Sequence, residues 1–225
     1  VNCVWPKDLD PMTDDVANAM DGLNDWLRGQ MAEDDRVALE KVLKATPAER
    51  MAAATHVVTY SHFVPRPDLI PEKRFLPSPE MAKQMGSNVL KKRVASIRPD
   101  VHVFARSCFG WDATLGGVRY VSAPLATLEQ RLRGDAAIGD FPHFEKGEPL
   151  MLRQGSSWAT PYIAGWSEYY KNSAREERSE EARASGPSKG AAFAPEWVEK
   201  SIKSEAEGYV MTQGGAHAGF TYGRV

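Results

Sequence analysis

The 225-residue sequence has two cysteines, no long apolar run and no excess of positive charge. Cys3 and Cys108 are too few for a disulfide framework, which favours a reducing compartment. No segment approaches the roughly 20 apolar residues that a membrane-spanning helix needs, so we expect membrane association only through partners. The net charge of −2 and the pI near 6.3 argue against binding nucleic acid.

The apolar content is sufficient for a folded domain. Hydrophobic residues make up 42% of the chain, which can fill the core of one domain with extensions or of two very small domains. The chain begins with Val and shows no signal or transit pattern, which is typical of a processed or truncated product. These properties predict an intracellular protein that is soluble or peripheral to a membrane.

Helical periodicity is clearest near the beginning of the chain. Residues 13–31 are predicted to form a helix because apolar residues recur on one helix face. These residues are Val16, Met20, Leu23 and Leu27. Residues 36–45 show the same spacing and predict a second helix. The segment Thr46-Pro47-Ala48-Glu49 is a capping box with Pro at the first helical position, and it predicts a short helix through Ala54.

The following segments predict strands and one further helix. Thr55–Tyr60 is rich in β-branched and aromatic residues, which is typical of a strand. Downstream we predict a helix at residues 88–97 and a strand at residues 101–105. A turn at Gly116-Gly117 then leads into a further strand at residues 118–122. Prolines exclude regular structure over residues 64–79, and residues 154–167 are predicted to form a loop. This order is half of a layered α/β sandwich, with a mixed sheet and flanking helices.

Two local patterns carry interpretations of their own. Asp112 either orients a neighbouring group or forms a turn before Gly116-Gly117, and the sequence favours the turn. A group of aromatic residues is interpreted either as a partner-binding cluster or as part of the core, and the sequence favours neither. These residues are Trp158, Trp166, Tyr169 and Tyr170.

Two predicted strands end in residue types that metal sites use. Ser61-His62 lies within VVTYSHFVPR, and Ala105-Arg106-Ser107-Cys108 lies within VHVFARSCFGWD. These segments resemble the calcineurin-like metallophosphoesterases, in which a Ser-His dipeptide and a later Gly-His-x-His end two strands and hold a two-metal centre. The resemblance implies the C-terminal half of that family's layered sandwich. The missing half would normally cover one sheet, so apolar surface is exposed unless an upstream segment or another chain covers it.

The resemblance covers about two thirds of the chain. The strongest match is Ser61–Leu76, which is similar to a Ser-His-Phe-x-Pro-Arg loop of eukaryotic members, often from algae and plants. Other matches follow in family order. They are Asn2-Cys3-Val4-Trp5-Pro6, Leu23-Asn24, GSNVLKKRV, VHVFARSCFGWDATLGGVRYV and the WSEYYK that ends at Lys171.

The same comparison implies that the metal site is degraded. Arg106 and Cys108 replace the family's histidines, and a guanidinium cannot be a ligand because it has only donors. A thiolate suits softer metals than those of phosphate chemistry. The family's motifs Asp-x-His, Gly-Asp-x-x-Asp and Gly-Asn-His-Asp/Glu have no match in residues 1–60. We therefore predict no bound metal, no other cofactor and no catalytic residue, with His62, Arg106 and Cys108 as vestigial positions.

The composition changes after Lys171. Residues 172–194 are charged and rich in small side chains, which predicts a linker after a truncated metallophosphoesterase-like domain at 1–171. Residues 195–225 are expected to form an extended C-terminal arm with a short amphipathic helix. The predicted partner-binding residues are the large apolar side chains of this arm, Trp197, Ile202, Tyr209, Phe220 and Tyr222.

Three functions follow from these patterns, and we favour the first. The first is a non-catalytic structural or accessory subunit whose partners are other proteins of a larger assembly. The likeness to algal and plant proteins suggests an organellar host, such as a photosystem complex of a plastid. The second is a metal-dependent phosphoesterase whose remaining motifs come from a missing N-terminal segment or another chain. A weaker third is a metal-free phosphate or nucleotide sensor that uses Arg66 and Arg106.

Overall fold

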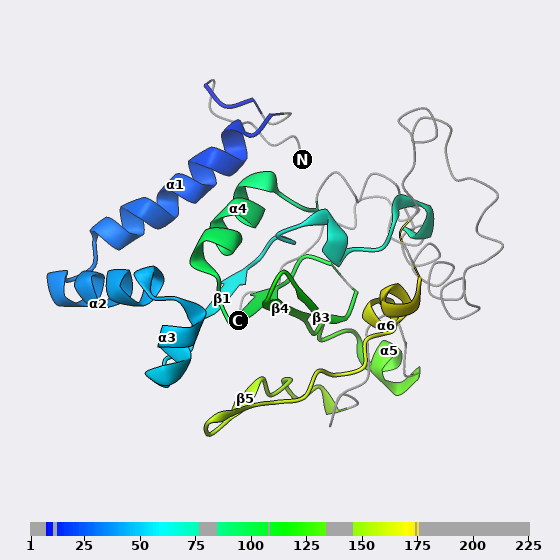
Figure 1. Cartoon of the computed structure of the whole chain (residues 1–225). Helices are drawn as coiled ribbons and strands as arrows, with labels where there is room; N and C mark the ends of the chain where they lie inside the picture. The colour runs from blue at the N-terminus through cyan, green and yellow to red at the C-terminus, as the bar shows by residue number, and fades with distance from the viewer. Residues whose placement is uncertain are drawn as a thin grey trace. The chain divides into compact units, whose positions relative to one another are not determined.

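The protein is a mixed α/β structure that divides into two compact units. The computed structural model describes residues 8–10, 13–76, 85–107, 109–133, 146–173 and 175. The first unit comprises Val1–Leu69, Met85–Ser107 and Asp112–Ser122, and the second comprises Ile70–Gln84, Cys108–Trp111 and Ala123–Val225. The α/β class that the sequence predicts is confirmed, as are the mixed sheet and its accompanying helices (Figure 1).

The central sheet has four strands in the order β1-β2-β4-β3. Strands β1 and β2 are parallel, and so are β2 and β4. Strand β3 runs antiparallel to β4 because only Gly116-Gly117 joins them, and a two-residue connection cannot join parallel strands. Both glycines have positive φ, 59° and 80°, as such hairpin turns require. The strands are β1 at Val58–Ser61, β2 at Val101–Phe104, β3 at Trp111–Leu115 and β4 at Val118–Ser122.

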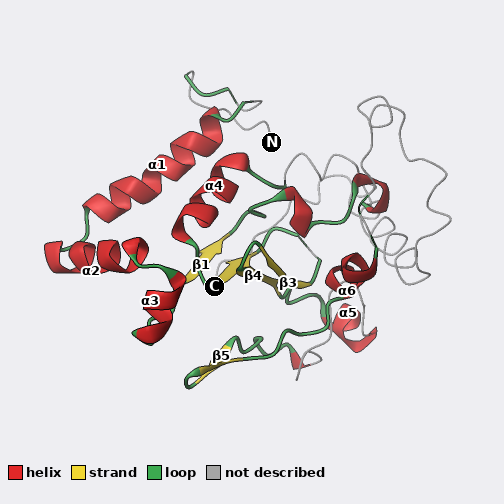
Figure 2. Cartoon of the chain, viewed as in Figure 1, coloured by secondary structure: helices red, strands yellow, loops and turns green. Residues whose placement is uncertain are grey.

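Three helices precede the sheet, and a fourth connects its first two strands (Figure 2). The capping box at Thr46 is present, since Thr46 Oγ1 accepts from the Glu49 amide at 3.2 Å and the Glu49 carboxylate accepts from the Thr46 amide at 2.7 Å. All four helices were predicted, with end positions that differ by up to three residues. They are α1 at Asp15–Gly29, α2 at Glu33–Lys44, α3 at Pro47–Ala52 and α4 at Asn88–Ile97.

The α3 and α4 helices are joined by one buried side chain. Arg50 donates to the Ile97 carbonyl at 3.2 Å and to the Arg98 carbonyl. These carbonyls lie at the C-terminal end of α4, where a cation also interacts favourably with the helix dipole. Arg50 is 2% exposed, so this contact holds α3 against the end of α4 inside the first unit.

Three local predictions were wrong. Asp112 does not form a turn: it is buried in β3 and pairs with Arg119 of β4. Residues 154–167 are not a continuous loop, because they contain a β5–β6 hairpin and the start of α6. The prolines of 64–79 permit two short 3-10 turns within the described part of that segment. The elements concerned are β5 at Arg153–Gln154, β6 at Ser157–Trp158, α6 at Gly165–Asn172, and the turns at Pro67–Leu69 and Lys73–Phe75.

The second unit contains one helix that the sequence analysis missed, and the described helices also bear on the membrane prediction. The short helix α5 spans Leu128–Arg133, which the sequence patterns did not indicate. None of the helices in the described part of the chain has the length and apolar character that a transmembrane span requires. The predicted linker and arm, and with them Trp197, Ile202, Tyr209, Phe220 and Tyr222, lie outside the described residues.

Candidate functional site

The candidate site is the edge of the sheet where β1 and β2 end. Ser61 is the last residue of β1 and is paired in register with Phe104, the last residue of β2. Just beyond, the Ala105 amide donates to the Ser61 carbonyl at 3.2 Å. The segments that carry the two sequence motifs therefore leave the sheet side by side. In α/β sheets, ligands usually bind at the carboxyl ends of the parallel strands.

The side chains that the sequence singled out are exposed at this edge. His62 is exposed in the turn after β1, and its ring lies edge-on to Phe63 with the centroids 5.2 Å apart. Arg106 is also exposed and adopts a left-handed backbone with φ 69°, in a tight turn in which the Ser107 amide donates to the Ala105 carbonyl at 2.9 Å. Cys108 lies outside the described residues.

Beneath this edge lies a buried histidine that the sequence analysis did not single out. His102 of β2 is 1% exposed. Its Nδ1 is 2.8 Å from Thr59 Oγ1 and its Nε2 is 3.0 Å from Ser61 Oγ, so both ring nitrogens contact hydroxyls of β1. The ring also packs edge-on against Tyr120 of β4, with centroids 5.7 Å apart. His102 thus connects three neighbouring parallel strands.

The hydrogen bonds of Ser61 determine which tautomer His102 adopts. Ser61 Oγ donates its single proton to the Phe63 carbonyl, at the short distance of 2.6 Å. The hydroxyl must therefore accept from His102, which places the imidazole proton on Nε2. Nδ1 is then the acceptor and receives the proton of Thr59 Oγ1. A nucleophilic serine needs the reverse arrangement, in which the imidazole accepts the hydroxyl proton. The Ser61–His102 pair therefore stabilises the sheet and does not activate Ser61.

Burial also keeps this histidine uncharged. Desolvation lowers the pKa of His102 from its ordinary value of 6.5 to about 4. Both ring nitrogens are in use, so neither is available to a metal. In the described ranges of the chain, no three His, Cys, Asp or Glu side chains gather in a group that could hold a metal ion.

Arg66, which the sensor hypothesis requires, is largely occupied by neighbours. Its Nε donates to Asp68 Oδ2 at 2.9 Å, and its Nη2 contacts the same carboxylate. The Arg66 guanidinium carbon also lies 5.8 Å from the centre of the Tyr120 ring, and both residues belong to the first unit. An arginine already paired with a carboxylate is a weaker candidate for binding phosphate.

The aromatic residues near α6 belong mainly to the core of the second unit. Trp166 is fully buried, and its ring lies 5.5 Å from Phe75 and 5.9 Å from Phe109, measured between centroids. Tyr169 and Tyr170 pack against Trp166 at 6.1 and 6.2 Å. Trp158 lies apart on β6, half-buried beneath the Arg153 guanidinium. Core packing, one of the two interpretations of this group, therefore applies to its three α6 residues.

Sequence patterns contained a signal for His102 that could have been used. His102 alternates with apolar residues in a buried strand, and Thr59 and Ser61 occupy alternate positions of β1, so all three face the same side of the sheet. A polar residue inside such a strand requires partners. The parallel register Thr59↔His102, which brings these residues together, is a tertiary feature.

Comparison of the chain with protein-family models, with curated proteins and with solved structures returned no match.

Proposed function

We propose that this chain is a non-catalytic, metallophosphoesterase-like subunit that functions through contacts with other proteins of a larger assembly. The observation that carries the proposal is the outer edge of β1. This strand ends the strand order, and no other strand in the described part of the chain lies on its second side. Its side chains Val58 and Tyr60 are 50% and 85% exposed. Edge strands of independent proteins are usually protected by charge, proline or a covering element.

The backbone of β1 is arranged to accept another strand. The carbonyls of Val57 and Ser61 accept from Asp100 and Ala105, so these alternate residues direct their backbone groups toward β2. By the alternation of a β-strand, Val58 and Tyr60 direct their N–H and C=O groups to the open edge. A partner strand added there would bind through main-chain hydrogen bonds. The resemblance to the metallophosphoesterases supports the same expectation, because the missing half of that sandwich precedes this strand.

The chemistry of the candidate site supports the absence of catalysis. Two-metal phosphoesterases need two ions about 3.5–4 Å apart to clamp the attacking and leaving oxygens. At the edge where β1 and β2 end, His62 is the one imidazole that the described structure exposes, while His102 is consumed by hydrogen bonds. Arg106 occupies a position where the resemblance places a ligand. The alternative, a phosphoesterase completed by a missing segment or another chain, would still have this arginine in its site.

The first test measures metal content and hydrolysis. We expect the purified full chain to bind less than one equivalent of Mn²⁺, Zn²⁺ or Fe²⁺ and not to hydrolyse p-nitrophenyl phosphate above background, because the exposed donor set is too small. The matched control is His62→Ala, which removes the remaining exposed ligand of the edge. Two equivalents of bound metal, together with hydrolysis that His62→Ala abolishes, would establish the phosphoesterase alternative.

The second test addresses the open edge. Tyr60→Pro removes one outward-facing amide and should leave the pairing with β2 intact, since Pro is tolerated on the solvent side of edge strands. Tyr60→Ser removes the ring and keeps the amide. We expect Tyr60→Pro to abolish co-purification with native partners and Tyr60→Ser to weaken it less. Met51→Ser, which truncates a large side chain on α3 that is 75% exposed, is the control. A stable monomer in native extracts would contradict the subunit role.

The host and the C-terminal arm belong to the same proposal. The arm residues Trp197, Ile202, Tyr209, Phe220 and Tyr222 offer apolar anchors that a neighbouring subunit would bury. The resemblance to algal and plant proteins points to an organellar assembly, such as a photosystem complex in plastids. Mass spectrometry of the proteins that co-elute with the wild-type chain but not with Tyr60→Pro would identify the host.

A further inference from the structure

The apolar stripe of α1 points away from the protein. The helix has no buried residue, although its apolar residues are spaced to cover one face. Met20, Leu23 and Leu27 are 51%, 53% and 55% exposed, and Trp26 beside them is 61% exposed. An amphipathic helix normally turns such a stripe toward the core. Single exposed apolar residues are ordinary, but a continuous stripe of them is typical of an interaction site.

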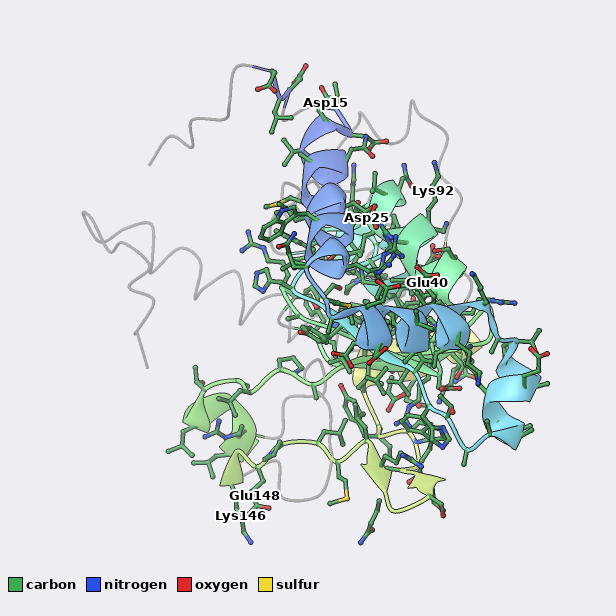
Figure 3. The ribbon with its side chains drawn as sticks, turned by 90° about the vertical axis from the view of Figure 1, so that its left-hand side faces the viewer. Asp15, Asp25, Glu40, Lys92, Lys146 and Glu148 are labelled. Atoms are coloured by element: carbon green, nitrogen blue, oxygen red, sulfur yellow. The ribbon has the colours of Figure 1, made fainter. Side chains whose placement is uncertain are left out.

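Ion pairs on the polar side of α1 hold the helix with its apolar stripe facing away from the core. Arg93 of α4 donates to both carboxylate oxygens of Asp21 at 2.8 Å, and to those of Asp25 at 3.1 Å. Asp21 follows Met20 by one residue, which places it about 100° further round the helix axis. Figure 3 shows Asp25 on α1 beside α4, which carries Lys92. Within the first unit, α1 is therefore held against α4 through its polar side, and its apolar stripe remains exposed.

The charge around the stripe restricts what can cover it. Residues 8–44 contain ten Asp and Glu and four Lys and Arg. Asp14 and Asp15 lie at the start of α1, and the acidic first turn of α2 (Glu33, Asp34 and Asp35) begins close to its end (Figure 1). A second copy of this chain would place acids against acids, and an anionic membrane would repel them. A partner whose apolar face is flanked by basic residues is complementary to the stripe and to the acidic residues at both ends of α1.

We propose that the α1 stripe is the docking site for a basic amphipathic helix of another protein. Met20, Leu23 and Leu27 receive the apolar face of that helix, while the acids at the two ends pair with its lysines or arginines. An amphipathic helix recognised in this way contributes apolar anchors at helical spacing. The inference rests on the proposed subunit role and specifies the surface and the chemistry of one partner.

The test uses the full chain and two designed helical peptides with the same leucine face, one carrying lysines and the other glutamates on its polar face. Fluorescence anisotropy should show the lysine peptide binding at least about tenfold more tightly. The double variant Leu23→Gln/Leu27→Gln should weaken it by about tenfold or more, because it removes two apolar anchors. Asp14→Asn/Asp34→Asn should reduce the salt dependence of binding. Met51→Gln, on α3, is the matched control and should bind like the wild type.

Other outcomes would overturn the inference. Equal binding of both peptides, or binding that the leucine variants leave unchanged, would remove α1 from the interface. Sedimentation that shows a dimer of the protein alone, dissolved by the leucine variants, would make a second copy the occupant. Binding to anionic phosphatidylserine vesicles that the leucine variants abolish would make a membrane the occupant. Circular dichroism must show that each variant retains the wild-type fold. If Leu23→Gln/Leu27→Gln does not, the milder variant Leu23→Ala takes its place.

The failure of this inference can be told apart from failure of the proposed function. If Tyr60→Pro breaks the native assembly while Leu23→Gln/Leu27→Gln leaves it intact and the lysine peptide does not bind, the subunit role stands and helix docking is wrong. If the chain binds two metals and hydrolyses p-nitrophenyl phosphate while the lysine peptide still binds the stripe, the non-catalytic role is wrong and the docking site stands.

Discussion

Replacing Asp112 with Asn should destabilise the protein by about 3–5 kcal/mol, because it neutralises the carboxylate that binds the largely buried Arg119 guanidinium. Arg119 binds the carboxylate through two parallel hydrogen bonds, Nε to Oδ1 at 2.8 Å and Nη2 to Oδ2 at 2.6 Å. The side chains of Asp112 and Arg119 are 0% and 11% exposed, so solvent screens the pair little. Urea unfolding of the full chain at pH 7 measures the change in the free energy of unfolding.

Two controls show whether burial causes this effect. Glu40→Gln breaks the exposed ion pair with Lys44 and should change stability little, since exposed pairs contribute little. The double variant Asp112→Leu/Arg119→Met removes both charges and should be more stable than Asp112→Asn alone, because the buried cation is removed together with the carboxylate that binds it. If Asp112→Asn proved as mild as Glu40→Gln, the strand pair would not depend on this contact.

The second large effect is a loss of stability at acidic pH that His102 causes. Its pKa is about 4 in the folded protein and close to 6.5 when unfolded, so between these values the unfolded chain binds more protons. Stability should therefore rise with pH. The contribution is fully present above pH 6.5, falls as the pH decreases through this range, and is lost below pH 4. Its size is about 3 kcal/mol, because one pKa unit corresponds to about 1.4 kcal/mol.

Urea unfolding between pH 4 and pH 7 tests this, with wild type and His102→Gln compared at each pH. The glutamine can bond to both hydroxyls but cannot titrate in this range, so its curve should lack most of the slope between pH 4 and 6.5. His62→Gln removes an exposed imidazole near the same edge and should retain that slope. Equal slopes for wild type and His102→Gln would show that His102 does not stay buried and neutral.

Helix ends were predictable where the residues that determine them are adjacent in the chain. The α4 helix begins where predicted because the Ser87 side chain accepts from the Leu90 amide, and it stops where Arg98 adopts a left-handed backbone with φ 51°. The capping box of α3 is equally local. Such hydrogen bonds join residues within one turn, so a single segment contains the whole signal.

The errors at Asp112 and His102 concern residues whose partners lie in another strand. Asp112 has a residue type that favours turns, and only the pairing of β3 with β4 places Arg119 against its carboxylate. The sequence placed His62 and Arg106 at the ends of two predicted strands, and the structure has them just after β1 and β2. The buried His102 of β2 was missed because the strand register decides which polar side chains meet.

What the sequence determined by itself is the α/β class, the identity of most helices and the apolar stripe of α1, since helical periodicity and capping depend on neighbours along the chain. The tertiary structure decided the direction in which that stripe faces. Arg93 is 72 residues from Asp21, and its ion pairs turn the polar side of α1 inward. The same holds for the open edge of β1 and the tautomer of His102. Each depends on which segments pack together, and periodicity carries no information about the partner.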